Sequence, residues 1–235
     1  SKRGYSYNYI DGLNLYQCNN TNRLVYLLKF LNSNLWAPNF DVDLTEDGRL
    51  FYLDKTKSRL DLIKSRYDLC KVSSLNSKPL QHPLIPCYNY DEIIAKIIAS
   101  PIHGDLQYDN ILISSKGVFS LLDWRHEFGK NVLMGDLYYD LAKLLGGVYL
   151  NYSKIKNNQF NACISEHNID YEYNPDCTFN KELLVFKNYC SKKELDFIHI
   201  RQLLSLVYVN MAPLHTPPFD LLLLSLAHQI YYYDF

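Results

Sequence analysis

Two short apolar segments joined by a tight turn constrain the fold of this 235-residue chain more than any other feature. The segments cover residues 110–114 and 118–122 and contain β-branched and other apolar side chains. The tripeptide Ser-Lys-Gly between them ends in Gly117, which can adopt positive φ without steric cost. This pattern predicts an antiparallel β-hairpin.

Polar side chains meet at the open end of this predicted hairpin. If the turn is centred on Lys116, Asn110 lies opposite Leu122 and Asp109 lies opposite Asp123. Asp105 precedes them in the same loop. Amide and carboxylate oxygens that leave room for water and phosphate are the ligands that Mg²⁺ prefers. A metal-assisted phosphoryl-transfer site is the simplest chemistry for this set; the alternative is that Asp, Asn and Gly act only as turn formers.

The rest of the chain shows helical periodicity. Apolar stripes predict helices near 21–31, 60–67, 91–98 and 134–150, with Pro101 ending the third. Two or three further helices are expected after residue 180, interrupted at Pro213 and at Pro217-Pro218. The predicted fold is mainly α with one small β-hairpin, in the α+β class.

Composition and charge exclude several classes of protein. The chain has 24 Lys plus Arg against 25 Asp plus Glu, so it lacks the basic surplus of a nucleic-acid-binding protein. The longest apolar run, 221–224, is far shorter than the roughly 20 residues of a membrane span. The six cysteines show no CxxC spacing and are interpreted as reduced core thiols. With no signal peptide visible, we expect a cytoplasmic protein without membrane insertion.

Longer motifs surround the hairpin. The string HGDLQYDNIL at 103–112, followed by LLDW at 121–124, resembles the catalytic and metal-binding loops of the aminoglycoside phosphotransferase and choline kinase families, which are similar to protein kinases. GDLYYDLA at 135–142 resembles the helix after the metal loop. YIDGLNL at 9–15 resembles the hinge that leads into the large lobe. The resemblance implies a hinge-like segment at 1–15 and one kinase-like C-terminal lobe over 16–235.

The resemblance also implies roles for individual residues. Asp105 is expected to act as the base at the acceptor hydroxyl, with Asn110 and Asp123 holding Mg²⁺ on the phosphates of ATP. His103 and Asp140 are expected to support the catalytic loop.

Other residues near these loops also have expected roles. Asp136 is predicted to cap the next helix. The candidates for substrate binding are Gln107, Trp124, Arg125 and His215. Arg125 departs from the acidic residue that many relatives carry after the Asp-Trp pair.

The span between Asp123 and Gly135 is too short for a phosphorylatable activation segment, which favours a small alcohol over a protein substrate. By resemblance the acceptor is an amino alcohol such as choline or ethanolamine, a sugar for bacterial capsule or lipopolysaccharide synthesis, or an aminoglycoside antibiotic. Tyrosines with Trp124 would suit a quaternary ammonium group. The alternatives are a non-catalytic kinase-like scaffold or binding module, and a metal-dependent phosphohydrolase.

A kinase of this type also needs an N-terminal β lobe with a phosphate-covering loop and a lysine. The chain contains neither a GxGxxG nor a GxxxxGK string. We therefore expect that the N-terminal lobe is missing from this chain, that the chain is a fragment of a longer protein, and that the fragment by itself is inactive.

Overall fold

The computed structural model describes residues 10–18, 20, 22–38 and 40–233 and has a mixed α+β fold that is about 50% helical with small sheets. Its helices are α1 (Arg23–Asn34), α2 (Thr45–Gly48), α3 (Lys55–Lys64), α4 (Tyr90–Ala95), α5 (Leu137–Tyr149), α6 (Tyr152–Lys156), α7 (Phe179–Lys192), α8 (Phe197–Met211) and α9 (Phe219–Tyr232). Its strands are β1 (Leu13–Asn14), β2 (Ser74–Leu75), β3 (Lys78–Pro79), β4 (Ala99–Ser100), β5 (Ile111–Ile113), β6 (Phe119–Leu121), β7 (Gly135–Asp136), β8 (Asn161–Ser165) and β9 (Asn168–Glu172).

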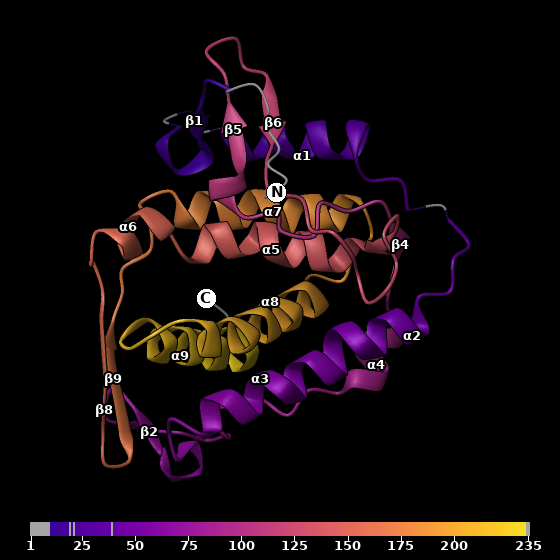
Figure 1. The fold of residues 1–235 in the computed structure, drawn as a ribbon. Coiled ribbons are helices and arrows are strands. Elements are labelled where there is room, and N and C mark those ends of the chain that lie inside the picture. Colours follow the sequence, from indigo (N-terminus) through magenta and orange to yellow (C-terminus); the bar gives the residue numbers. More distant parts are fainter. Residues whose placement is uncertain (1–9, 19, 21, 39, 234–235) are drawn as a thin grey trace, which may run out of the picture.

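Helix α5 forms the centre of the molecule (Figure 1). It packs against α7 on one side and α8 on the other, and α8 in turn packs against α9. Every residue of α5 is buried, including the predicted stripe with Leu141, Leu144 and Leu145. A helix that is covered all round in this way is a rigid platform, because its side chains are held in a close-packed interior.

The predicted hairpin is confirmed. Strands β5 and β6 pair in the expected register, with Ile111 opposite Leu121, and the turn residue Gly117 has φ 77°. The Leu122 amide donates to the Asn110 carbonyl at 2.8 Å, so the pairing reaches the end that carries the polar side chains. Strand β1 adds to the other edge of β5 and makes a three-stranded sheet, which the sequence did not predict.

The expectation of a single hairpin is wrong. Strands β8 and β9 form a second hairpin, and β9 pairs in parallel with β2, far away in the sequence. Only Ala162 and Ile169 are buried in this hairpin. Polar residues fill most of the other positions, so the segment has no strong apolar alternation by which a strand would be recognised.

Two further expectations need correction. The third helix ends at Ala95 rather than near Pro101, because β4 follows and pairs with β7. Cys18 and Cys190 are buried, whereas Cys70, Cys87, Cys163 and Cys177 are exposed, so the expectation of core thiols is wrong for these four.

The described helices include none that is both long enough and apolar enough to cross a membrane. The helices expected after residue 180 are present as α7, α8 and α9. Part of the predicted hinge, residues 1–9, and Thr21, the first residue of the helix predicted near 21–31, lie outside the described residues.

Helices α2 and α3 are joined by a π-helical turn, Arg49–Asp54, into one long rod. The rod runs beneath α8 in the view of Figure 1. The π-turn carries Phe51 and Tyr52, which are both buried. The Tyr52 hydroxyl donates to Asp136 at 2.6 Å and so ties the rod to the start of α5. Such π-turns occur frequently at functional sites, and this one faces the cavity described below.

Candidate active site

The loop at 103–110 is anchored to α5 by Asp140. The amides of His103 and Gly104 donate to its carboxylate at 2.8 and 2.7 Å, and the Trp36 indole donates at 3.0 Å. Burial raises the pKa of Asp140 to about 6, and these hydrogen bonds oppose a larger rise. The predicted support of the loop by Asp140 is therefore present as a contact.

Gly104 is required where the loop turns. Its φ is +78°, in the left-handed region, and a Cβ at this position would lie 2.5 Å from the Cβ of Arg125. The Arg125 side chain in turn donates from Nε to the Gly104 carbonyl at 2.9 Å. This close approach connects the loop to the segment after β6.

Asp105 is held on both carboxylate oxygens. Lys143 Nζ lies 2.6 Å from Oδ1, and Asn110 Nδ2 donates to Oδ2 at 3.3 Å and to the Asp105 carbonyl at 2.9 Å. The Asp105 side chain remains 28% exposed. Since each carboxylate oxygen can accept more than one hydrogen bond, Asp105 retains acceptor capacity for a hydroxyl.

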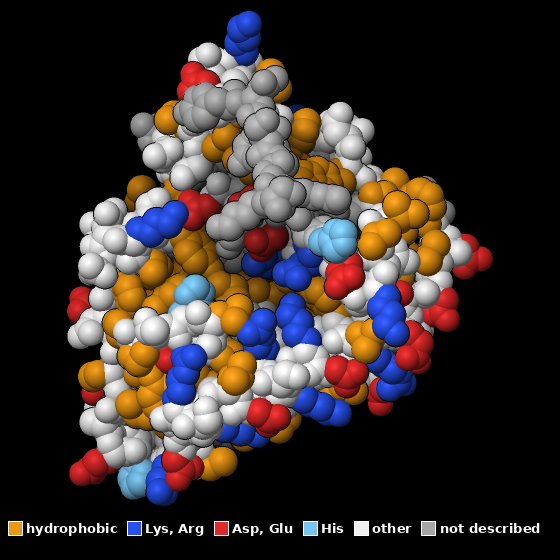
Figure 2. All heavy atoms as spheres, in the orientation of Figure 1, with side chains coloured by type: hydrophobic (Ala, Val, Ile, Leu, Met, Phe, Trp, Pro, Cys, Tyr) orange, Lys and Arg blue, Asp and Glu red, His pale blue; other side chains and the backbone are white. Residues whose placement is uncertain are grey.

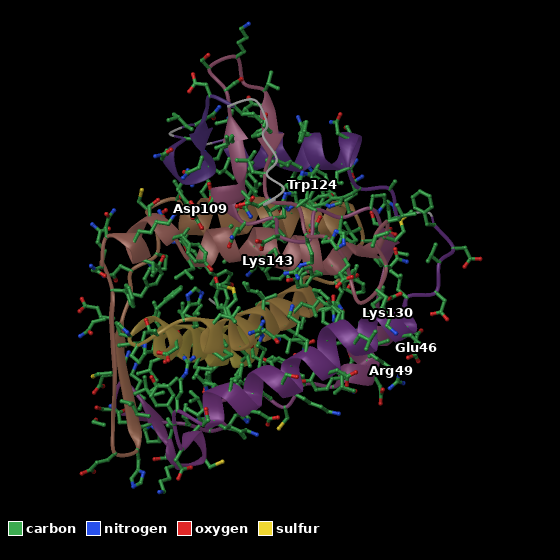
Figure 3. The ribbon with its side chains drawn as sticks, viewed as in Figure 1. Glu46, Arg49, Asp109, Trp124, Lys130 and Lys143 are labelled. Carbon is green, nitrogen blue, oxygen red and sulfur yellow. The ribbon has the colours of Figure 1, made fainter. Side chains whose placement is uncertain are left out.

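Lys143 was not predicted from the sequence. Its side chain is 8% exposed and lies on α5, one turn after Asp140, in the space between α5 and α8 (Figure 3). Burial acts to lower the pKa of Lys143, but Tyr139 and Asp105 outweigh it and raise the pKa above its usual value. The sequence did contain a signal for Lys143, since it lies within the apolar stripe of a predicted helix. Lysine is almost never buried unless it is paired, so a lysine at such a position predicts an acidic partner.

His103 supports the loop from inside. The Asp105 amide donates to its Nδ1 at 3.2 Å, and its ring packs on Trp124 with centroids 4.7 Å apart. Burial lowers the pKa of His103, which favours the neutral ring at pH 7. Neutral His103 fits the predicted bracing role.

Asp136 caps α5, as predicted. Its carboxylate accepts from the Tyr138 amide at 3.0 Å and from the Ile98 amide at 3.2 Å. Burial raises the pKa of Asp136 to about 7, and the hydrogen bonds from Tyr52, Tyr138 and Ile98 oppose this rise.

Asn110 and Asp123 offer oxygen donors at the end of the hairpin. The Asn110 amide nitrogen is used by Asp105, which leaves its Oδ1 as the available ligand atom. Asp123 follows β6 with φ 55°, a conformation that clusters at functional sites. Among the described residues its carboxylate has no ion pair or hydrogen bond. An amide oxygen and a carboxylate that no other described residue pairs with fit Mg²⁺ in donor chemistry.

Asp109 does not join this pair. Its carboxylate accepts from Asn14 in β1 at 3.3 Å and forms an ion pair with Lys156 in α6 at 3.0 Å. Across the described ranges, no cluster of three or more His, Cys, Asp or Glu side chains could hold a metal. A magnesium ion here would therefore take its remaining ligands from phosphate and water.

A cavity of about 300 Å³ opens beside Asp105. Three of the four predicted substrate-binding residues, Gln107, Arg125 and His215, line it. Trp124 is not among its lining residues; it is 53% exposed, and its indole donates to the Leu121 carbonyl at 3.2 Å. Figure 3 shows Trp124 on the hairpin side of α5.

The cavity also contains residues that sequence reasoning missed. Lys55 and Arg59 lie one turn apart on α3 and line the cavity together with Asp105. Their spacing places them on one helix face, but a lysine-rich helix usually directs such residues to solvent. Neither Asn110 nor Asp123 lines the cavity, so it lies to one side of the candidate metal pair.

Comparisons of the chain with protein-family models, with curated proteins and with solved structures gave no match. The resemblance to the aminoglycoside phosphotransferase and choline kinase families therefore stays a prediction that rests on the motif residues.

Proposed function

We propose that this chain carries the acceptor and metal side of an ATP-dependent kinase that phosphorylates a hydroxyl group of a small molecule. The observation that supports this most is the position of Asp105. Its carboxylate is held by Lys143 and Asn110 and borders a cavity of small-molecule size.

The reaction requires little covalent chemistry from the protein. The acceptor oxygen forms a bond to the γ-phosphorus of ATP, the bond from that phosphorus to the β,γ-bridging oxygen breaks, and ADP leaves. The hydroxyl proton passes to the Asp105 carboxylate and then to solvent. Because the transition state is loose, Asp105 acts mainly by orienting the hydroxyl.

Asn110 and Asp123 would hold Mg²⁺ at the hairpin end. The bound ion would neutralise charge on the phosphate oxygens. The hydrogen bonds of Asn110 support this assignment. Its Nδ2 donates to Asp105, so its Oδ1 points away from the candidate base and is left for the metal.

The function is tested with the 235-residue chain and with the product of its complete reading frame. Either protein is incubated with ATP, Mg²⁺ and a panel of neutral, cationic and anionic alcohols, and phosphorylated products are detected by phosphorus NMR. Calorimetry of Mg-ADP binding tests the metal and nucleotide site separately, because this measurement requires no acceptor.

In the product of the complete reading frame, we expect Asp105→Ala to lower turnover by about 10²- to 10⁴-fold, within the range of general acid–base effects. Asp123→Ala is expected to weaken Mg-ADP binding. The matched control is Asp170→Ala, which removes an exposed carboxylate from β9. Wild-type turnover in Asp105→Ala, or Mg-ADP binding that is indifferent to Asp123, contradicts the proposal.

A further inference from the structure

The cavity beside Asp105 has a strong excess of positive charge. Its charged lining residues are the cations Lys55, Arg59, Arg125 and Lys143 and the single acid Asp105. Lys143 is paired with Asp105, and none of the ion pairs between described residues includes the other three cations. The chain as a whole has a net charge of −1, so this excess is local.

Two of these cations are held in place by groups other than carboxylates. Lys55 Nζ lies 4.2 Å from the centre of the Phe51 ring. The Arg125 guanidinium lies 5.3 Å from the same ring, and its Nε donates to the Gly104 carbonyl. Aromatic faces and a carbonyl orient these groups without pairing them with a carboxylate, so neither contact competes with an anionic ligand.

The crowding of these cations is unfavourable in the empty cavity. Burial, together with the nearby charges of Arg125, Lys143 and Arg59, lowers the pKa of Lys55 to about 7, and Asp105 acts in the opposite direction. Half-buried like charges repel one another, and a cavity lined by one sign of charge attracts ligands of the opposite sign. An anion in the cavity would relieve this repulsion.

Figure 2 shows Lys and Arg side chains gathered in a hollow at the centre of the face that it displays. The cavity belongs to the acceptor side of the site, because it is lined by Asp105 and Gln107 but by neither Asn110 nor Asp123. Phosphates held by a metal at the hairpin end would therefore leave these cations free for the acceptor.

We propose that the acceptor is a small alcohol that carries a carboxylate or phosphate group, which binds to Lys55, Arg59 and Arg125 while the hydroxyl meets Asp105. This inference rests on the proposed kinase function and narrows its substrate. Choline, ethanolamine and aminoglycosides carry the wrong sign of charge for this cavity. A monosaccharide-sized acid suits its volume of about 300 Å³.

The inference is tested by calorimetry on the 235-residue chain without nucleotide. The probes are D-gluconate, D-glucose 6-phosphate and inorganic phosphate, with D-glucose and choline for comparison. We expect at least one anionic probe to bind at least tenfold more tightly than glucose and choline to show no binding. The ratio between gluconate and the phosphates distinguishes a carboxylate site from a phosphate site.

Charge-removing variants locate the binding. Lys55→Gln and Arg59→Gln are each expected to weaken the binding of the anionic probe at least tenfold. The matched control, Lys57→Gln, changes an exposed lysine of the same helix that does not line the cavity, and it should leave the affinity unchanged.

The following results overturn the inference: none of the three anions binds, glucose or choline binds as tightly, Lys57→Gln has the same effect as Lys55→Gln, or Mg-ADP displaces the anion. The last result would mean that the cations hold nucleotide.

Failure of the proposed kinase function can be distinguished from failure of this inference. If the anion binds through Lys55 and Arg59 but no alcohol is phosphorylated, the site exists without the reaction. If choline or a neutral sugar is phosphorylated while acids neither bind nor react, the kinase function stands and this inference fails.

Discussion

Lys143 Nζ lies 2.6 Å from Asp105 Oδ1, and the lysine side chain is 8% exposed. The ion pair joins the central helix to the loop that carries the candidate base. The other carboxylate oxygen, Oδ2, accepts a hydrogen bond from Asn110 Nδ2. The orientation of Asp105 thus depends on a residue that belongs to neither of the two loop motifs.

Replacing Lys143 tests this dependence. Lys143→Met should lower turnover about 100-fold, the order expected when a reacting group is displaced by about 1 Å. It should also reduce the free energy of unfolding by about 1–3 kcal/mol, less than for a fully buried pair because Asp105 is partly exposed. Steady-state kinetics and urea unfolding measure the two effects.

The control for Lys143 is Lys156→Met. Lys156 also pairs with an aspartate, Asp109, but its side chain is 69% exposed, so its loss should change neither turnover nor stability measurably. Lys143→Arg should recover part of the turnover if charge at Asp105 is what matters. Full activity of Lys143→Met would show that Asp105 is oriented without the lysine.

Asp140→Asn should destabilise the loop. Both carboxylate oxygens accept from N–H donors, so an amide NH₂ on either side would face a donor inside a fully buried site. We expect the free energy of unfolding to fall by about 2–4 kcal/mol. Urea unfolding monitored by circular dichroism gives the value. The exposed Asp170→Asn serves as control, and equal stability of the two variants would contradict the anchoring role.

The affinity of the cavity for anions should decrease as pH rises through about 7. Lys55 has a pKa of about 7 because of burial and because of Arg125, Lys143 and Arg59, while Asp105 acts in the other direction. Above this pH, Lys55 must take up a proton to form an ion pair with the ligand. Calorimetry with gluconate, whose carboxylate keeps one charge over this range, should show a loss of at least about tenfold between pH 6 and pH 9, equivalent to 1.4 kcal/mol.

Lys55→Arg provides the control for this pH dependence, because a guanidinium remains charged throughout this range. The variant should bind with nearly constant affinity between pH 6 and pH 9. The same slope in wild type and Lys55→Arg would assign the titration to another group.

Lys55→Met should stabilise the protein while it weakens anion binding. The pKa of Lys55 is lowered on folding, so the unfolded chain binds more protons between about pH 7 and the usual lysine pKa of 10.5, and stability rises with pH across this window. Removing the charge should therefore raise Tm most below pH 7. A gain of about 1 kcal/mol corresponds to about 2–4 °C for a chain of this size.

Differential scanning calorimetry at pH 6 and pH 10.5 measures this gain, with Lys57→Met as the exposed control on the same helix. Lys55 Nζ lies 4.2 Å from the centre of the Phe51 ring, and an uncharged methionine side chain of similar length is compatible with this aromatic neighbour. A lower Tm for Lys55→Met at pH 6 would show that the charge stabilises the empty cavity.

Local patterns were sufficient for much of the fold; the roles of Asp105, Asn110 and Asp123 remain predictions. The β5–β6 register followed from the turn at Gly117, because pairing in a short hairpin is set by the turn. The apolar stripe of α5 and the cap at Asp136 followed from helical periodicity and helix-end chemistry. These features depend on residues that are close in the sequence.

Other elements depended on pairings between distant segments. Strand β9 pairs with β2, and β4 pairs with β7, through backbone hydrogen bonds that leave little trace in side-chain type. The sequence therefore indicated one hairpin and a longer third helix. Tertiary contacts overrode the local preference in both places.

The sequence by itself predicted the hairpin whose two ends bring Asn110, with Asp105 just before it, near Asp123, because the spacing of these residues and the hairpin turn are local. Only the tertiary structure decided what surrounds Asp105. Lys143 comes from α5, and Lys55 comes from α3, and each is a common surface residue until packing places it in the cavity. The charge of a cavity is a sum over distant segments, so it becomes visible only when the chain is folded.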